Sequence, residues 1–291
     1  LLFIYEASYI DSTLLRMIFS QTKHCKIVFM GDPAQLLTVG CKEAPVFAAG
    51  FPTAKLTEVV RQAEGNPIID LSTKFRNTVN TGEFFNFKPD GNYIKHLSRD
   101  DFEDAILAEF MRPDWTHNDA KVMAWTNKTV VNYNHAINDH VTGSPEFKVG
   151  DYGICNKHMP MRNGGIKTDQ TVLVTAIGPG SSDFGFPGNY ITLNDYYNVF
   201  LPKNIADKKI AIKQARDADD LQTVAQIENT WIDLRPAYSC TINKAQGSTY
   251  RKAFIDLDDV SRCNSGEQIA RMLYVAVSRA SENVFLTGDL V

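Results

Sequence analysis

The sequence predicts an α/β protein, in which the strands of parallel sheets alternate with helices and a β-rich segment is inserted between them. Near the start, apolar strand-like runs at Leu1–Tyr5 and Lys26–Met30 flank a helical run at Ser12–Phe19, which is the order of a β-α-β unit. From about Gly143, by contrast, Gly and Pro recur between short runs of β-branched and aromatic residues. The α/β pattern returns after Pro236.

We expect three regions along the chain. Residues 1–64 would be part of a first parallel-sheet domain, residues 65–142 and 236–291 a second one, and residues 143–235 the β-rich insert. The apolar run at residues 1–5 has no turn, cap or Met before it and reads as a buried strand. The first domain is therefore expected to be incomplete, with an upstream segment missing.

The spacing of apolar residues predicts further helices at residues 67–76 and 101–111, and a strand at residues 121–125. Residues 205–229 are charged and helix-prone; the sequence leaves open whether they pack, and a solvated helical face is the favoured interpretation. The last helix is the best specified. Ser265 and Gln268 form a capping-box pattern, and the apolar residues after them repeat at the helical period: Ile269, Met272, Leu273, Ala276 and Val277.

Composition and charge bound the classes of partner. The 291 residues are 44% hydrophobic, which is ordinary for a globular protein. The formal net charge is −4, so no overall basic field draws the protein to nucleic acid, and any such binding must come from a local groove. Five scattered cysteines without a C-x-x-C pair indicate a reducing compartment and a cytoplasmic location, and argue against structural zinc. No apolar run reaches the roughly 20 residues of a membrane span.

Acidic residues stand at the ends of the first two predicted strands. Glu6 follows the run LLFIY, and Asp32 lies in the GDP turn after the second strand. Ligands of parallel sheets collect at the carboxyl ends of the strands. A carboxylate there can face a magnesium nucleotide and a water molecule. Taken alone, an acidic cap at a strand end would explain Glu6 equally well.

Six segments resemble, in order and at fitting intervals, motifs II, III, IV, IVa, V and VI of superfamily 1 helicases. They are LLFIYEAS (1–8), FMGDPAQL (29–36), LTEVVRQ (56–62), AWTNKTVVNYNHAIN (124–138), AYSCTINKAQGSTY (237–250) and LYVAVSRA (273–280). The matches span nearly the whole chain, which makes the resemblance specific. Within this superfamily the chain looks most like the phage-type Dda/RecD-like group. This likeness implies two RecA-like domains, the first incomplete, with a small SH3-like β domain inserted.

The resemblance implies four catalytic or nucleotide-binding side chains and one glycine. Glu6 would be the base that orients water, and Gln35 would couple the γ-phosphate to the neighbouring domain, although a loop glutamine is the alternative. Arg61 and Arg279 would reach the γ-phosphate from opposite sides, since a planar guanidinium suits phosphate oxygens. Arg279 lies outside the apolar stripe of its helix, so burial is not expected; a surface salt bridge is its alternative. Gly247 would let the backbone approach phosphate.

The resemblance also implies two groups of DNA-binding residues. Trp125, Thr126 and Asn127 would meet the sugar-phosphate chain, and the indole could stack on a base, although a buried core Trp is equally well supported. The motif V residues would contact DNA or nucleotide: Thr241, Asn243, Lys244, Gln246 and Ser248. Asn243 departs from the family, which usually has His before this lysine, so no ionisable role is carried over to it.

Two departures concern the nucleotide and its metal. Tyr5 stands where the family has a magnesium-binding Asp, and a neutral phenol is a poor Mg²⁺ ligand, which leaves Glu6 as the candidate metal residue. In addition, no G-x-x-x-x-G-K-[S/T] loop occurs; the nearest fragment, NGGIKT at residues 163–168, has the wrong spacing. We therefore expect the chain on its own neither to hold ATP tightly nor to hydrolyse it at a helicase rate.

The resemblance implies a monomeric, ATP- and Mg²⁺-dependent DNA helicase that moves along single-stranded DNA from 5′ to 3′. A role in replication or recombination, with the corresponding protein partners, is implied in the same way, in the host cytoplasm if the protein is phage-encoded. The alternative from another class is an inactive DNA-binding or replisome-tethering remnant, which Tyr5 and the missing loop favour. A nuclease is a weaker possibility, since no cluster of spaced carboxylates with a lysine supports it.

Overall fold

The computed structural model describes residues 1–38, 40–41, 43–56, 65–161 and 164–290. These form two compact units. Unit 1 comprises Leu1–Ile106, Asn118–Val130 and Cys240–Val291, and unit 2 comprises Leu107–His117 and Val131–Ser239. Unit 1 thus holds the described part of the first predicted region and much of the second. Unit 2 holds the β-rich region together with residues 107–117, 131–142 and 236–239, which were predicted to belong to the second. No helix in the described residues is long and apolar enough to cross a bilayer.

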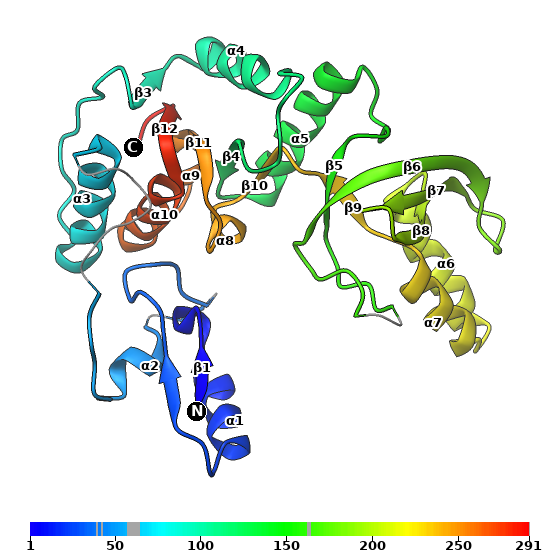
Figure 1. Cartoon of the computed structure of the whole chain (residues 1–291), viewed down its shortest axis with the longest axis horizontal. Coiled ribbons are helices and arrows are strands. Elements are labelled where there is room, and N and C mark those ends of the chain that lie inside the picture. The colour runs from blue at the N-terminus through cyan, green and yellow to red at the C-terminus, as the bar shows by residue number, and fades with distance from the viewer. Residues whose placement is uncertain (39, 42, 57–64, 162–163, 291) are drawn as a thin grey trace. The chain divides into compact units, whose positions relative to one another are not determined.

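The amino-terminal part of unit 1 is the predicted β-α-β unit. Strand β1 (Leu2–Ile4) pairs in parallel with β2 (Ile27–Phe29), and α1 (Ser12–Gln21) connects them (Figure 1). Helix α1 begins where it does because the Asp11 carboxylate accepts hydrogen bonds from two backbone N–H groups of its first turn. Two short helices complete this part: the 3₁₀ helix η1 (Ala7–Tyr9) and α2 (Pro45–Ala48).

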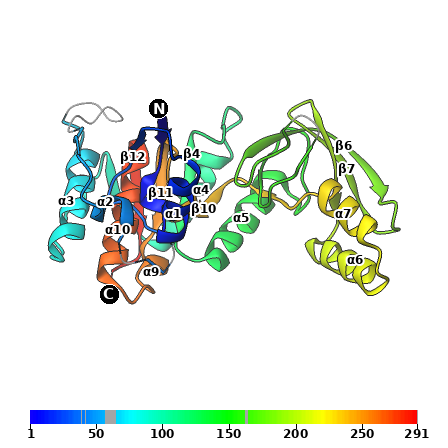
Figure 2. The ribbon, with the colours of Figure 1, turned by 90° about the horizontal axis from the view of Figure 1, so that it is seen from below.

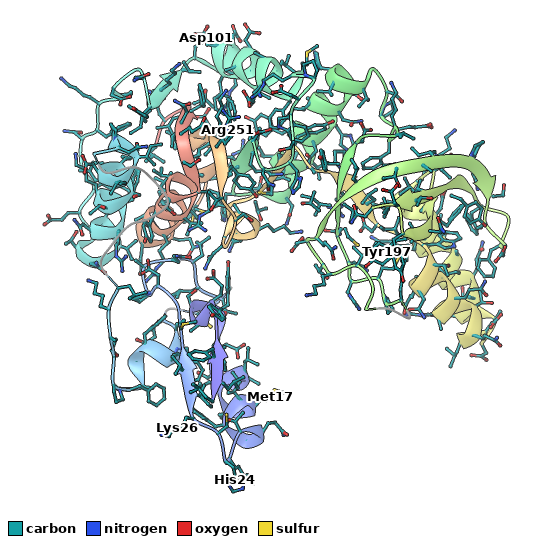
Figure 3. All side chains as sticks on the ribbon, viewed as in Figure 1. Met17, His24, Lys26, Asp101, Tyr197 and Arg251 are labelled. Carbon is teal, nitrogen blue, oxygen red and sulfur yellow. The ribbon has the colours of Figure 1, made fainter. Side chains whose placement is uncertain are left out.

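The prediction that residues 1–5 form a buried strand is confirmed for the strand, β1, but wrong for its burial. Leu1 and Phe3 are 75% and 51% exposed, and on α1 Met17 also projects away from the ribbon (Figure 3). Successive side chains of a strand point to opposite faces. Ile4 therefore packs on the small cluster around Ala7 and Val46, while Phe3 points to the other face. Apolar composition alone does not distinguish the covered face from the open one.

The main sheet of unit 1 has the strand order β10-β4-β11-β12-β3. These strands are β3 (Ile94–Leu97), β4 (Ala120–Ala124), β10 (Ser239–Thr241), β11 (Tyr250–Asp256) and β12 (Ala280–Thr287). The pairs β4–β11, β11–β12 and β12–β3 are parallel. All five residues of β4 are buried, as expected for an interior strand of a parallel sheet.

Helices pack around this sheet. Helix α3 (Pro67–Thr81) lies beside α10 (Gly266–Ser278) in both views (Figures 1 and 2), and together they bury the main apolar core of unit 1. The start of α10 is confirmed, because Ser265 Oγ accepts from the Gln268 N–H. The other helices are α4 (Arg99–Phe110), α5 (Asn127–Thr142), α8 (Ile242–Ala245) and α9 (Leu257–Val260).

Unit 2 contains an antiparallel sheet with the order β8-β7-β6-β5-β9. Its strands are β5 (Tyr152–Cys155), β6 (Thr171–Ser181), β7 (Pro187–Leu193), β8 (Tyr197–Pro202) and β9 (Leu234–Pro236). Helices α6 (Ile205–Asp217) and α7 (Leu221–Thr230) account for the charged segment. Both helices pack through a narrow stripe, which includes Ala211 and Ile227, against Phe200 and Trp231. Most of their other residues are solvated, so the segment both packs and faces solvent.

Candidate functional site

Glu6 and Gln246 meet in unit 1, although 240 residues separate them in sequence. The Gln246 side-chain amide donates to Glu6 Oε2 at 3.1 Å and to Ser8 Oγ at 3.3 Å. In return, Gln246 Oε1 accepts from the Tyr9 hydroxyl at 2.8 Å, and the same hydroxyl lies 3.2 Å from the Asn243 carbonyl oxygen. Because a carboxylate can only accept whereas a phenol can also donate, the contact with Glu6 sets which way the Gln246 amide points. The amide N–H groups therefore face Glu6.

The backbone on both sides of this contact adopts the left-handed conformation. Gly247, directly after Gln246, has φ +83°, which glycine adopts without strain. Glu6 has φ +54°, an uncommon conformation for a residue with a side chain. Such strain persists where the surrounding structure holds it, and it clusters at functional sites. The turn after β1 thus directs the Glu6 carboxylate toward the end of α8.

A second set of contacts joins the loop after β2 to helices α3 and α10. Asp32 accepts from Arg76 Nη2 at 2.9 Å and from the Tyr274 hydroxyl at 2.6 Å. Arg271 Nη1 donates to the carbonyl oxygens of Pro33 and Gln35, at 2.6 and 2.8 Å. These bonds hold the backbone of the Asp32–Gln35 loop. The side-chain oxygen Oε1 of Gln35 is itself buried and has no hydrogen-bond partner among the described residues.

Arg279 is buried, contrary to the expectation from its place on the helix. It is only 3% exposed, and it donates to the backbone oxygens of Val275 and Ser248 and to Ser278 Oγ. The cause lies beyond the helix, because residue 279 leads directly into β12 in the interior of the sheet. Arg279 therefore lies inside unit 1 and not on its surface.

The electrostatic effect of Arg279 shows what surrounds it. Burial and the Glu6 carboxylate together raise the pKa of Tyr9 to about 12, against the opposing positive charge of Arg279. Burial, a hydrogen bond to Asp32 and its charge raise the pKa of Tyr274 to about 12, against the positive charges of Arg76 and Arg279. Arg279 thus acts on the tyrosines of both contact sets.

Of the predicted catalytic residues, Glu6 belongs to the first set of contacts and the Gln35 backbone to the second, and the charge of Arg279 acts on one tyrosine of each set. The fourth, Arg61, lies outside the described residues. Tyr5 is 72% exposed, and no group of three His, Cys, Asp and Glu side chains in the described part of the chain is arranged to hold a metal. Magnesium is commonly bound by one or two carboxylates together with substrate phosphates. Glu6 therefore fits a Mg²⁺ that arrives with a nucleotide, and not a metal caged by protein alone.

The predicted DNA-binding residues fall into two groups at opposite ends of the parallel strands. Trp125, Thr126 and Asn127 follow the carboxyl end of β4, with Trp125 partly buried against the main core and Asn127 exposed. The motif V group precedes the amino end of β11. There Thr241 caps α8 by accepting from the Lys244 N–H, the Lys244 side chain is exposed, and the Ser248 carbonyl accepts from Arg279.

Sequence reasoning missed Tyr9, Arg271 and Tyr274, which belong to these two sets of contacts, and also Asp259, whose carboxylate binds the backbone of Trp125 and Thr126. Tyr9 lies three residues after Glu6, and Tyr274 and Arg271 lie within or next to the sixth motif, so proximity to a motif was an available signal. For Asp259, the only signal in the sequence was the acidic run that follows a predicted strand.

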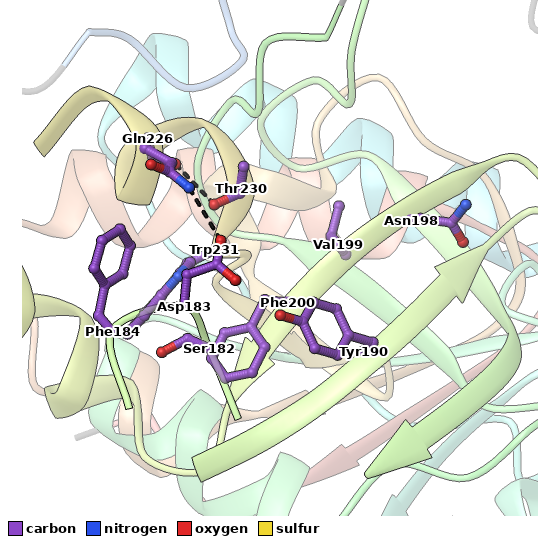
Figure 4. Close-up of a pocket in the computed structure, with 10 residues that line it drawn as sticks. All are labelled: Ser182, Asp183, Phe184, Tyr190, Asn198, Val199, Phe200, Gln226, Thr230 and Trp231. Atoms are coloured by element: carbon purple, nitrogen blue, oxygen red, sulfur yellow. Dashed lines mark hydrogen bonds between the residues drawn. The ribbon is translucent and has the colours of Figure 1, made fainter. Parts of the chain in front are cut away.

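Unit 2 contains a small cavity of its own (Figure 4). Its floor includes Phe200 and Trp231, and at its rim Gln226 donates to Asp183 at 3.2 Å. None of the residues predicted for nucleotide or DNA lines it.

Comparison with known proteins agrees with the architecture. Residues 236–287 match the family model of the UvrD-like helicase C-terminal domain. Among solved structures, a Pif1 helicase from Bacteroides in complex with ADP-AlF3 and ssDNA aligns over 100% of this chain and 71% of its own, with TM-score 0.54 and 17% identity. Pif1 from Candida albicans aligns over 99% and 71%, with TM-score 0.56 and 17% identity. A structure described as two coordinating Pif1 helicases at forked dsDNA aligns over 100% of this chain and 69% of its own, with TM-score 0.55 and 16% identity. The predicted α/β fold is confirmed, and it is a fold shared with these helicases.

Proposed function

We propose that this chain carries the part of an ATP-dependent superfamily 1 DNA helicase that follows the phosphate-binding G-x-x-x-x-G-K-[S/T] loop. The intact helicase would translocate on single-stranded DNA. The observation that carries the proposal is the hydrogen bond between Glu6 and Gln246. The resemblance assigns Glu6 to the nucleotide and Gln246 to DNA or nucleotide, and the two side chains meet although they lie 240 positions apart. Arg279 adds to it, since its charge acts on the same tyrosine as Glu6.

The chemistry follows from the groups present. Glu6 is placed to orient a water molecule, and Gln246 holds its carboxylate from the other side of the contact. Arg279 supplies a positive charge that can stabilise charge developing on a transferred phosphoryl group. Gln35 offers a buried acceptor. Mg²⁺, when bound with the nucleotide, would neutralise phosphate charge. No G-x-x-x-x-G-K-[S/T] loop occurs in the 291 residues, so the proposal places in this chain the groups around the γ-phosphate and the DNA only.

Single-stranded DNA is the proposed track. The Bacteroides Pif1 that shares this fold was solved with ssDNA, and the exposed Asn127 and Lys244 offer polar and basic contacts on unit 1. We further propose a Dda/RecD-like affiliation, with an SH3-like character for unit 2, 5′-to-3′ movement and action as a monomer. Work in replication or recombination, in the cytoplasm of a phage host, stays a prediction from the resemblance.

The test is ATP hydrolysis by the intact protein with and without oligothymidylate. We expect ssDNA to stimulate turnover and Glu6→Gln, which keeps the size of the side chain, to abolish it while leaving ssDNA binding in place. Gln222→Glu, an exposed change on α7, serves as the matched control and keeps wild-type turnover.

An inactive DNA-binding remnant is the second candidate, favoured by Tyr5 and the absent phosphate loop. It predicts ssDNA binding without turnover at any Mg²⁺ concentration. Loss of both binding and turnover would contradict both candidates.

A further inference from the structure

Asp259 is a buried carboxylate that lies against the start of helix α5. It is 2% exposed and belongs to α9, directly after the carboxyl end of β11. Its Oδ2 accepts from the backbone N–H groups of Trp125 and Thr126, at 2.8 and 2.7 Å. Its Oδ1 accepts from the hydroxyls of Thr126 and Thr129, at 2.8 and 2.7 Å. One side chain thus binds four donors of the β4–α5 turn.

The amino end of a helix attracts anions because its first N–H groups have no partner in the helix and its dipole is positive there. At α5, Asp259 binds the N–H of the cap residue Thr126 and that of Trp125 before it, so an internal carboxylate already stands at this end of the helix. Thr126 is used a second time, because its Oγ1 accepts from the Thr129 N–H at 3.3 Å as the helix cap. A DNA phosphate at this place would have to displace Asp259.

The neighbouring arginines are compatible with the contact between the Asp259 carboxylate and the β4–α5 turn. Arg99 binds the neighbouring Asp256 and Asp258, and the partner of Asp259 on its own helix end is Arg262, whose Nη1 lies 3.3 Å from Oδ1. Arg262 is mostly solvated, whereas Asp259 faces inward. The carboxylate is therefore held between its own arginine and the β4–α5 turn.

We propose that Asp259 is a positioning residue for DNA binding, and that Thr126 is part of the scaffold it builds and not a DNA contact. Asp259 fixes the backbone of Trp125 and Thr126, so that the half-buried indole of Trp125 and the exposed side chain of Asn127 are presented to a single strand. This inference rests on the proposed function, since it names which groups of the β4–α5 turn meet the DNA.

A matched pair of hydroxyl deletions tests the assignment of Thr126. Thr126→Val and Thr129→Val each remove a hydroxyl bound to the same Asp259 oxygen, with little change of shape. Affinity of the intact protein for labelled oligothymidylate is measured by fluorescence anisotropy. We expect the two variants to lose affinity equally, by no more than about 3-fold. Asn127→Ala should lose more, about 5- to 10-fold, as removal of a direct hydrogen bond does. Asp259→Asn should weaken binding about 10-fold, with no further loss when Thr126→Val is added.

A spectroscopic measurement separates positioning from mere stabilisation. In protein labelled with 5-fluorotryptophan, the Trp125 ¹⁹F resonance is assigned from its loss in Trp125→Phe. We expect Asp259→Asn to shift this resonance without DNA present. Asp258→Asn, a change at the half-exposed neighbour that pairs with Arg99, should leave it in place.

Each possible result either supports the proposal or overturns a stated part of it. A loss in Thr126→Val well beyond that in Thr129→Val, with the Trp125 resonance unshifted in Thr126→Val so that the loss of the cap has not moved the turn, would show that the Thr126 hydroxyl touches DNA and would overturn the assignment. An unshifted Trp125 resonance and unchanged affinity in Asp259→Asn would overturn the positioning role. If the wild-type protein binds no ssDNA, both the proposed function and this inference are contradicted. If the wild-type protein binds ssDNA but the variants do not show the expected losses of affinity, only this inference is contradicted.

Discussion

The Tyr274 hydroxyl lies 2.6 Å from Asp32 Oδ2, a contact between residues 242 positions apart. We predict that Tyr274→Phe lowers the free energy of unfolding by about 1 to 2 kcal/mol, near the lower end of the range for a hydrogen bond to a charged group. The loss is limited because Arg76 continues to bind Asp32. Urea unfolding followed by fluorescence measures it.

Tyr93→Phe is the control for this substitution. Tyr93 is an exposed tyrosine of the same unit, so its change should stay within about 0.5 kcal/mol of wild type, as is usual for surface positions. Equal stability of both variants would show that the contact between Tyr274 and Asp32 contributes nothing.

The raised pKa values of Tyr9 and Tyr274 predict a loss of stability at high pH. Each stands at about 12 in the folded protein, against 10.0 as the ordinary value. A group whose pKa is raised on folding contributes stability that is complete below its unfolded pKa and is lost as pH rises through the folded one. The free energy of unfolding should therefore fall between pH 10 and 12.

The Tyr9→Phe/Tyr274→Phe double variant checks the origin of this fall. Without the two phenols, the decline of unfolding free energy across the same pH interval should be shallower than in wild type. An identical slope would assign the decline to other groups.

Gln246→Glu should break the contact with Glu6. Two carboxylates about 4 Å apart repel by roughly 1 to 4 kcal/mol, depending on how much water screens them. We predict a loss of stability within this range that shrinks in 1 M NaCl, together with loss of ssDNA-stimulated ATP hydrolysis. Gln222→Glu introduces the same charge at an exposed site and should change neither quantity. Wild-type hydrolysis in Gln246→Glu would remove this residue from the mechanism.

Arg279→Ala should lower ATP turnover by about 10³- to 10⁵-fold if Arg279 acts as an arginine finger, with ssDNA binding largely kept. Burial adds a second effect, because the Ala variant leaves backbone acceptors of Val275 and Ser248 without their donor. Arg279→Lys retains the charge and separates the two effects.

Arg251→Ala is the matched control for the finger. Arg251 is another arginine of unit 1, and it pairs with Glu282 and Asp119 at a half-exposed site (Figure 3). The Arg251→Ala variant should hydrolyse ATP at the wild-type rate. Equal turnover in Arg279→Ala and Arg251→Ala would contradict the finger role.

Tyr5→Asp should increase Mg²⁺-dependent turnover of the intact protein, because it adds a carboxylate next to Glu6 where the phenol is a poor ligand. The change is expected to be well tolerated, since Tyr5 is largely exposed. A titration of ATPase rate against Mg²⁺ measures it. The same midpoint and maximum in both proteins would show that position 5 does not touch the metal.

The elements that the sequence predicts well are those with local signals. Helix α10 has its cap and its apolar period within one short segment, and β11 and β12 each contain a short apolar run, AFI and VFL. Arg279 was misjudged because its burial depends on the strand after the helix and not on the helix itself. Phe3 was misjudged because apolar character does not tell which face of a strand is covered.

The candidate site was predictable to the extent that family motifs mark it. Glu6 and Gln35 were found because their neighbours in sequence carry the resemblance. Asp259 was not, because its four donors lie 130 to 134 positions away and meet it only through the parallel pairing of β4 with β11. A contact of that kind has no pattern in the chain before the sheet is assembled.

The interleaved strand order has a consequence for biogenesis. Within the described residues, the early strands β3 and β4 do not pair with each other; their neighbours are β12 for one, and β10 and β11 for the other. On the ribosome, β3 and β4 therefore stay unpaired until residues 239–287, which form β10, β11 and β12, have been synthesised. Dependence on chaperones during synthesis, and failure to fold when these three strands are removed, are the expected results.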